Sequence, residues 1–194
     1  MSLTMERCKW CSLKNPLYIK YHDEEWGRPN FEEKYLYEML ILESFQAGLS
    51  WECVLNKRED FRKAYDNFDI DKVCRYDNKK IQELLSNEKL IRNKLKINAS
   101  INNSKIFKEI QNEYGTFHEY LKDFTNDKII YENDKTTSEL SDNISEDLRK
   151  RGMKFVGSTI IYSYLQAIGV IYSHDEECFM NKKASLRSSI KCKF

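Results

Sequence analysis

The sequence predicts an all-α protein, and three observations support this fold class. From residue 31 onward, apolar residues recur three and four positions apart, which is the spacing of one helix face. Glycines fall at the ends of these periodic segments, apart from Gly169 near the close of the last one. No segment shows the sustained apolar and polar alternation of a half-buried strand.

The first strongly periodic segment covers residues 31–48, and Gly48 stands where its helix would end. Ser50 can cap the next helix, which we predict over residues 51–68. The same periodicity predicts the remaining helices at residues 70–75, 78–86, 93–113, 117–124, 142–151 and 158–171. We expect the segment TTSELSDN, residues 136–143, to be a mobile loop.

Length and composition favour a single compact unit. A chain of 194 residues with 41% hydrophobic residues can bury one core. Its longest apolar runs are short or interrupted by polar residues, so we expect no membrane association. A formal net charge of +1 provides no global attraction to nucleic acid. Any DNA contact must come from local basic segments such as residues 88–105 and 181–194.

The cysteines indicate a reducing compartment. No secretory signal opens the chain, so we expect the six cysteines to be reduced thiols or metal ligands in a cytoplasmic, monomeric protein. We expect one domain over residues 5–180, with residues 181–194 as a basic tail. Residues 1–4 are expected to be an appended segment before a natural start at Met5.

Cysteine and histidine residues gather near both ends of the chain. Cys8 and Cys11 precede His22, and the segment HDEEC places His174 four residues before Cys178. In a helix, residues four apart share a face and could bind one ion. Two ligands from each end would form a closed tetrahedral site that suits structural zinc, with either Cys8 or Cys11 as the N-terminal thiol. The alternative is that these are small core residues and ordinary surface histidines.

Glu43 occupies a position where the helix pattern calls for an apolar residue. It continues the stripe formed by Leu36, Met39 and Leu40. A carboxylate on a buried face costs several kcal/mol unless it is paired or lines a cavity, which makes Glu43 a candidate site residue. The alternative is a glutamate that turns to solvent or pairs with a lysine. Trp51 begins the next helix and could face the same pocket.

Aromatic residues are dense before the first periodic helix. Such rings often belong to a core, but a pocket of rings with one acid would suit a flat cationic heterocycle through stacking and charge neutralisation. The rings that could join Glu43 and Trp51 are Trp10, Tyr18, Tyr21 and Trp26.

Five segments of the chain closely resemble the bacterial 3-methyladenine DNA glycosylase I family. They are MERCKW, NPLYIKYHDEEWG, LILESFQAGLSW, VLNKREDFR and RKRGMKFVGSTIIYSYLQAIG, and they follow one another in the family's order from Met5 to about Cys178. The resemblance implies a helix-hairpin-helix DNA glycosylase fold with a structural zinc ion that joins the two chain ends. The implied zinc ligands are Cys8, His22, His174 and Cys178.

The resemblance also implies roles for the pocket residues. The damaged base would stack on Trp51, and the catalytic residues Glu43 and Tyr21 would form hydrogen bonds to it. Trp10, Tyr18 and Trp26 match positions that complete the aromatic wall. Four protein ligands would leave no open position on the metal for an activated water, so zinc is expected to be structural.

The implied activity is that of a monofunctional DNA repair enzyme. It would hydrolyse the N-glycosidic bond of N3-methyladenine in double-stranded alkylated DNA and so start base excision repair. N3-methylation gives adenine a positive charge and makes it a good leaving group, so flipping the base and gripping the cation can suffice. The alternative is a zinc-stabilised, non-catalytic nucleic-acid-binding module, which would leave the glutamate on the apolar stripe unexplained. A zinc hydrolase would need one of the four ligands to be replaced by water.

The expected hairpin, placed around residues 79–101, departs from the usual pattern because it contains no glycine. We expect Asn87 or Asn93 to take the positive φ value that glycine would supply. Lys94 and Lys96 are expected to contact DNA phosphates.

Overall fold

The computed structural model describes residues 5–181, so residues 1–4 and nearly all of the predicted basic tail lie outside the described residues. Among residues 5–181, none of the helices combines the length and the apolar composition needed to cross a bilayer. The elements are α1 (Pro16–Glu24), α2 (Glu33–Gln46), α3 (Trp51–Leu55), α4 (Arg58–Ala64), the 3₁₀ helix η1 (Asp66–Phe68), α5 (Ile70–Val73), α6 (Asn78–Ser86), α7 (Lys94–Tyr114), α8 (Phe117–Thr125), β1 (Ile130–Tyr131), α9 (Glu139–Lys150), α10 (Ser158–Ala167) and β2 (Ile171–Tyr172).

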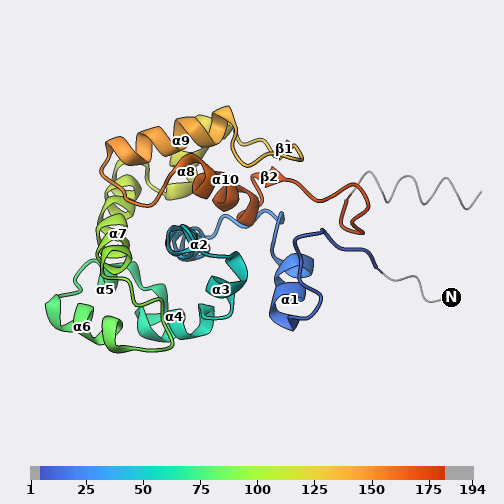
Figure 1. The fold of residues 1–194 in the computed structure, drawn as a ribbon. Coiled ribbons are helices and arrows are strands. Elements are labelled where there is room, and N and C mark those ends of the chain that lie inside the picture. The colour runs from blue at the N-terminus through green and yellow to red at the C-terminus, as the bar shows by residue number, and fades with distance from the viewer. Residues whose placement is uncertain (1–4, 182–194) are drawn as a thin grey trace, which may run out of the picture.

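Helix α2 runs through the centre of the molecule and is seen nearly end on in Figure 1, with other helices arranged around it. Every residue from Leu36 to Phe45 is buried. The helix packs against α3, α7, α8 and α10. A helix covered on all sides belongs to the core, so its two buried glutamates need an explanation. Glu38 has one, since it pairs with Arg58 at 2.6 Å and with Arg62 at 2.8 Å.

Several helices confirm the sequence prediction. Helix α6 has the predicted bounds, α7 begins and ends one residue later than predicted, and α8 ends one residue later. The Ser50 hydroxyl accepts a hydrogen bond from the Cys53 N–H and so caps α3. Gly48 follows the end of α2 with a φ of +74°. Periodicity and caps therefore located these helices correctly, whereas the helix predicted over residues 158–171 ends at Ala167, before strand β2.

The prediction of one helix over residues 51–68 is wrong. Helix α3 ends at Leu55, and the chain turns before α4 starts at Arg58. The Arg58 guanidinium is buried and donates to Glu25 and Glu38, each at 2.6 Å. The turn gives α4 a direction that satisfies both carboxylates. These ion pairs join residues far apart in the sequence, which a local helix pattern does not reveal.

Positive φ values stop the helical segment soon after α4. The φ angles of Asp66, Asn67 and Phe68 are all near +50°. Three successive residues in the left-handed region cannot continue a right-handed α-helix. Phe68 is 2% exposed, so the tight turn serves to return an apolar side chain to the core.

Two further helix starts differ from the prediction. Helix α1 was not predicted, although Asn15 caps it by accepting the Leu17 N–H and Pro16 occupies its first position. Helix α9 begins at residue 139 because Ser138 and Ser141 form a reciprocal capping box. The prediction that all of residues 136–143 form a mobile loop is therefore wrong.

The chain is mostly helical rather than wholly so. Strands β1 and β2 pair in parallel, with Ile130 opposite Ile171 and Tyr131 opposite Tyr172, and Figure 1 shows them side by side. Two-residue strands are too short to show alternation in a sequence. Their pairing places the loop after β1 beside the segment that leads to His174.

Gly169 allows the end of α10 to approach the chain that follows α1. A Cβ atom at this position would lie 2.3 Å from backbone atoms of Arg28 and Pro29, and the φ of +80° also favours glycine. On either side, the Gly27 N–H donates to the Gln166 carbonyl at 3.0 Å and the Asn30 N–H donates to the Ile168 carbonyl at 3.1 Å. The N-terminal segment thus contacts α10 directly through its backbone.

Candidate active site and metal cluster

A cavity of about 390 Å³ opens among α1, α2, α3 and α10. The six aromatic and acidic residues predicted to form a pocket all line it, namely Trp10, Tyr18, Tyr21, Trp26, Glu43 and Trp51. The remaining lining residues are Gln46, Asp134, Lys135, Ser163, Gln166, Ser173 and Asp175. The structure therefore brings together every predicted pocket residue.

The rings meet at angles and form two groups within the wall. Tyr21 and Trp51 have centroids 5.3 Å apart with planes tilted by 46°. Trp10 lies 4.8 Å from Trp26 in an edge arrangement and 5.2 Å from Tyr18 in a tilted one. Such contacts are favourable for aromatic pairs and rigidify the wall. The pocket is thus lined by closely packed rings that could receive a flat ligand.

Glu43 is the charged group deepest in this wall. Its side chain comes from the central helix α2, the residue is 3% exposed, and its Oε2 atom is buried without a hydrogen-bond partner. Burial raises the pKa of Glu43 to about 8. Burial disfavours the ionised form, and a nearby cation would favour it again. The expectation of an inward-facing carboxylate is confirmed, and the alternative of a solvent-facing one is excluded.

Two more polar atoms in the pocket are buried without a partner, Gln46 Oε1 and Trp51 Nε1. Gln46 follows Glu43 by three residues, so both lie on the same face of α2. Sequence reasoning did not single out Gln46, although its spacing from Glu43 was a usable signal. The pocket thus offers two unpaired acceptors and one unpaired donor to a ligand.

Tyr21 stands opposite Trp51 at the end of α1. Burial raises the pKa of the Tyr21 phenol well above its usual value, and Glu43 adds to the shift. The hydroxyl therefore stays protonated near neutral pH and remains a hydrogen-bond donor.

Four buried residues from both ends of the chain form a Cys/His cluster made of Cys8, His22, His174 and Cys178. Their ligand atoms all lie within 4.8 Å of one another, an arrangement that could hold a metal ion. Nδ1 of His174 lies 3.4 Å from Cys8 Sγ and 3.6 Å from Cys178 Sγ. Nε2 of His22 lies 3.4 Å from Cys178 Sγ. Tetrahedral zinc with ordinary bond lengths separates sulfur and nitrogen ligands by about 3.5 Å.

The groups around the cluster orient its ligands. Nδ1 of His22 contacts the Asp23 carboxylate at 2.8 Å, which directs Nε2 toward the cluster. The N–H groups of Asp175 and Met180 each donate to a cysteine sulfur, Cys8 and Cys178 respectively, at 3.4 Å. Such donors favour a thiolate.

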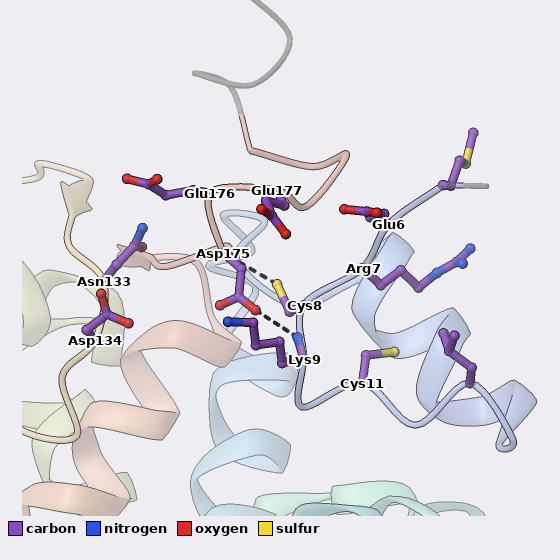
Figure 2. A pocket seen from close by; sticks show the side chains of 12 residues that line it. Glu6, Arg7, Cys8, Lys9, Cys11, Asn133, Asp134, Asp175, Glu176 and Glu177 are labelled. Atoms are coloured by element: carbon purple, nitrogen blue, oxygen red, sulfur yellow. Dashed lines mark hydrogen bonds between the residues drawn. The ribbon is translucent and has the colours of Figure 1, made fainter. Parts of the chain in front are cut away.

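Figure 2 shows the face beside the cluster, where Asp175 lies next to Cys8 and its carboxylate accepts the Lys9 N–H at 2.7 Å. Asp175 also lines the aromatic pocket, so one residue borders both sites. Cys11 is buried but contacts the Tyr18 carbonyl at 3.8 Å and is not part of the cluster. The N-terminal thiol of the cluster is therefore Cys8.

The structure between α6 and α7 differs from two expectations about the hairpin, one about backbone φ values and one about Lys96. Asn87 and Asn93 have φ values of −78° and −117°, so neither takes a positive φ. Asn93 instead caps α7 by accepting the Lys96 N–H. The expectation that Lys96 faces phosphates is wrong, because its ammonium is buried and binds two backbone carbonyls. Lys94 is exposed at the start of the same helix.

A family model described as methyladenine glycosylase matches residues 10–181. The chain belongs to the methyladenine glycosylase family. It is 41% identical over 180 residues to DNA-3-methyladenine glycosylase 1 of Escherichia coli (strain K12), a match that covers 90% of this chain and 96% of that relative. The resemblance inferred from the motifs is confirmed.

Solved structures of methyladenine glycosylases share the fold. A crystal structure of 3-methyladenine DNA glycosylase I superposes with a TM-score of 0.87 at 37% identity and covers 91% of this chain and 100% of that one. The enzyme from Staphylococcus aureus, described for its recognition of 3-methyladenine, gives a TM-score of 0.85 at 30% identity over 90% of this chain and 96% of that one. The match thus extends over nearly the whole length of both proteins.

Proposed function

We propose that this protein is a DNA repair glycosylase that hydrolyses the N-glycosidic bond of N3-methyladenine in alkylated DNA and releases the free base. Members of its family that match it along nearly their whole length are named for this activity. We assign this activity to a single glycosylase domain that covers residues 5–180. Its reaction would be the first step of base excision repair.

One observation carries the proposal, and it is the unpaired carboxylate of Glu43 among the rings of the pocket. A buried carboxylate without a partner destabilises a fold, so its presence favours a role in binding a ligand. A cation with hydrogen-bond donors would offset that destabilisation. A non-catalytic nucleic-acid-binding module would have no such use for Glu43.

The proposed mechanism requires little chemistry from the protein, because N3-methylated adenine already carries the charge that weakens its bond to the sugar. The base leaves the duplex and enters the pocket. Glu43 accepts a hydrogen bond from its exocyclic amine and opposes its positive charge. Tyr21 orients the base, and Trp51 stacks on its face. The glycosidic bond breaks, and the base leaves with the bonding electrons as neutral 3-methyladenine. Water adds to the sugar carbon and loses one proton to the solvent, which leaves an abasic sugar.

The remaining rings exclude water and restrict the base to one orientation. Trp10, Tyr18 and Trp26 form this part of the wall. Because a dry pocket strengthens charge interactions, the contact between Glu43 and the base gains energy there. Placement of the base and its contact with Glu43 in a dry pocket thus both contribute to the proposed rate enhancement.

We also propose that the Cys/His cluster binds one structural zinc ion. The fit is supported by sulfur to nitrogen distances of 3.4–3.6 Å and by the complete burial of both histidines. When bound, the ion would supply a cross-link between the two chain ends. With four protein ligands it would have no open position for substrate, and the reaction is assigned to pocket residues alone.

The proposed partner is double-stranded DNA, which a monomer in the cytoplasm would bind. We assign the role of the DNA-binding hairpin to α6, α7 and the segment between them, where Lys94 is exposed. A nearly neutral protein needs such a local basic contact to hold phosphate. The five described cysteines are free, which agrees with a reducing compartment.

Incubation with N-methylated duplex DNA tests the function. We expect release of 3-methyladenine, identified by chromatography against a synthetic standard, and abasic sites in equal number. Unmethylated duplex of the same sequence is the control. A folded, metal-loaded protein that released no methylated base would overturn the proposal.

A further inference from the structure

Lys96 has an unusual environment for a lysine. The residue is 8% exposed, and its ammonium donates to the carbonyl oxygen of Phe45 at 2.9 Å and to that of Ala47 at 2.6 Å. Burying an ammonium is unfavourable unless strong acceptors surround it. Here two backbone carbonyls are those acceptors. They hold the Lys96 ammonium against the backbone at the end of α2.

In the sequence, these two carbonyls lie between the pocket residues Glu43 and Trp51. Phe45 belongs to the last turn of α2, which carries Glu43, and Ala47 follows the helix as its C-cap residue. Carbonyls in the last turn of a helix lack partners within the helix and form the negative end of its dipole. Lys96 satisfies them at the point where the chain turns toward Trp51. The spacing between Glu43 and Trp51 therefore depends on this turn.

Lys96 reaches this turn from the start of α7. Its own N–H is capped by the Asn93 side chain at 3.1 Å, which fixes the backbone from which the side chain extends. Lys94, two residues earlier, is exposed. One side chain thus connects the beginning of α7 with the turn between Glu43 and Trp51, which both line the pocket.

We propose that Lys96 is a positioning residue that holds the α2–α3 turn, and with it Glu43 and Trp51, in the geometry that grips the flipped base. The proposal rests on the proposed function. Without the ammonium, two carbonyls at the end of α2 lose their partner and the turn relaxes toward water. Glu43 and Trp51 then shift relative to each other, and misplacement by about 1 Å is enough to lower a rate roughly a hundredfold.

The test compares Lys96→Met, which keeps the apolar stem, with Lys96→Gln, which keeps one shorter donor. Lys63→Met, at an exposed position of α4 outside the proposed DNA-binding segment, is the control. Three measurements are made on folded protein of equal metal content: the single-turnover rate at saturating methylated duplex, the affinity for that duplex, and the affinity for free 3-methyladenine from tryptophan fluorescence. Hydrogen exchange of amides 47–51 reports the turn itself.

For Lys96→Met we expect a roughly tenfold to hundredfold loss in rate and in affinity for the free base, with duplex affinity changed less than threefold. Lys96→Gln should fall between Lys96→Met and the unmodified protein, and amides 47–51 should exchange faster in both variants. Lys63→Met should match the unmodified protein.

Normal free-base affinity and normal rate in whichever Lys96 variant folds would overturn the role of Lys96 alone. A loss confined to duplex affinity would also overturn it, because that result would assign Lys96 to phosphate binding. Failure of the unmodified protein to release 3-methyladenine would instead overturn the proposed function.

Discussion

The molecule contains two buried polar clusters that border the same residue, Asp175, and they differ in how their polar atoms are satisfied. In the Cys/His cluster, sulfur and nitrogen atoms face one another at 3.4–3.6 Å, and neighbouring N–H groups and Asp23 support them, although the other ring nitrogen of His174, Nε2, is buried without a partner. In the aromatic pocket, buried atoms of Glu43, Gln46 and Trp51 have no partner. The first arrangement converges on a point, whereas the second is directed into a cavity.

This difference suggests different roles for the two clusters. The Cys/His cluster is arranged to stabilise the fold, whereas the aromatic pocket reduces stability and is arranged to bind a ligand. Polar atoms that converge can be satisfied permanently by one ion, and that ion then contributes to folding. Polar atoms around a cavity remain unpaired until a ligand enters, so the protein is less stable than it could be. Substitutions in the two clusters should therefore change stability in opposite directions.

The largest expected effect follows from removing a ligand of the Cys/His cluster. Cys8→Ser or His174→Ala should abolish stoichiometric zinc and lower the free energy of unfolding by an amount on the order of several kcal/mol, because metal binding contributes to folding. Elemental analysis and thermal unfolding measure the two effects. Cys11→Ser, which removes a buried thiol outside the cluster, should retain the metal. Full metal content in both cluster variants would show that other ligands hold it.

The second largest effect concerns Glu43, whose carboxyl group should make the free energy of unfolding depend on pH. Its pKa rises from 4.5 to about 8 on folding, so the unfolded chain ionises first as the pH increases. The unmodified protein should lose stability between pH 4.5 and pH 8, by a few kcal/mol at most. Glu43→Gln should lack this loss and be the more stable protein at pH 8.

Denaturant unfolding of the two proteins from pH 4 to pH 9 measures this difference. Glu109→Gln, at an exposed position of α7, is the control and should follow the unmodified protein. A constant difference between Glu43→Gln and the unmodified protein at every pH would contradict a raised pKa at Glu43.

A smaller free-energy change is expected in catalysis. Glu43→Gln keeps the shape of the side chain but replaces the charged acceptor, and a hydrogen bond to a charged partner contributes about 1.5–3 kcal/mol. Excision of 3-methyladenine should therefore slow roughly 10- to 150-fold while fold and metal content persist. Single-turnover kinetics on methylated duplex is the measurement. An unchanged rate would remove Glu43 from the site.

Trp51→Ala provides the comparison within the pocket. It should also slow excision, but by loss of stacking, which contributes roughly 1–3 kcal/mol per base. The effect of Trp51→Ala should persist for neutral analogues of the base, whereas that of Glu43→Gln should be confined to cationic ones.

The smallest effect is expected outside both clusters. Lys94→Glu should weaken DNA binding a few-fold to tenfold on every sequence alike and reduce the salt dependence of binding, because phosphate contacts carry no sequence information. Binding titrations at several salt concentrations measure it, with Lys63→Glu, at an exposed position of α4, as the control. If the two variants behaved alike, the DNA face would lie elsewhere.

The sequence predicted most of the helices because helical periodicity and caps are local signals. It did not predict the break after α3, since that break accommodates the ion pairs of Arg58 with Glu25 and Glu38, which are distant in sequence. The strands were missed because two residues cannot show a period. The break after α3 was missed because it depends on contacts between residues far apart in the sequence. The strands were missed because each is too short to show a pattern.

For the candidate site, an apolar stripe and the family motifs predicted Glu43 and the rings, and the structure places them in one cavity. The residues missed at its rim, such as Asp134, arrive there through the pairing of β1 with β2, which is a tertiary event. Lys96 was misjudged although a signal existed. It shares a spacing of four, seven and eleven residues with Ser100, Asn103 and Phe107, all of them buried.

The close approach at Gly169 has a consequence for the order in which the protein can form during synthesis. Trp10, Tyr18 and Tyr21 emerge from the ribosome early, but residues 166–169 contact the chain that follows α1, and residues 174 and 178 complete the Cys/His cluster. The pocket can be completed only when nearly all of the described chain has been made, because residues 163, 166, 173 and 175 supply part of its lining. A nascent chain released before α10 would contain Glu43 and every ring of the wall but none of the lining that α10 supplies, and so would be a methyladenine glycosylase with an incomplete pocket.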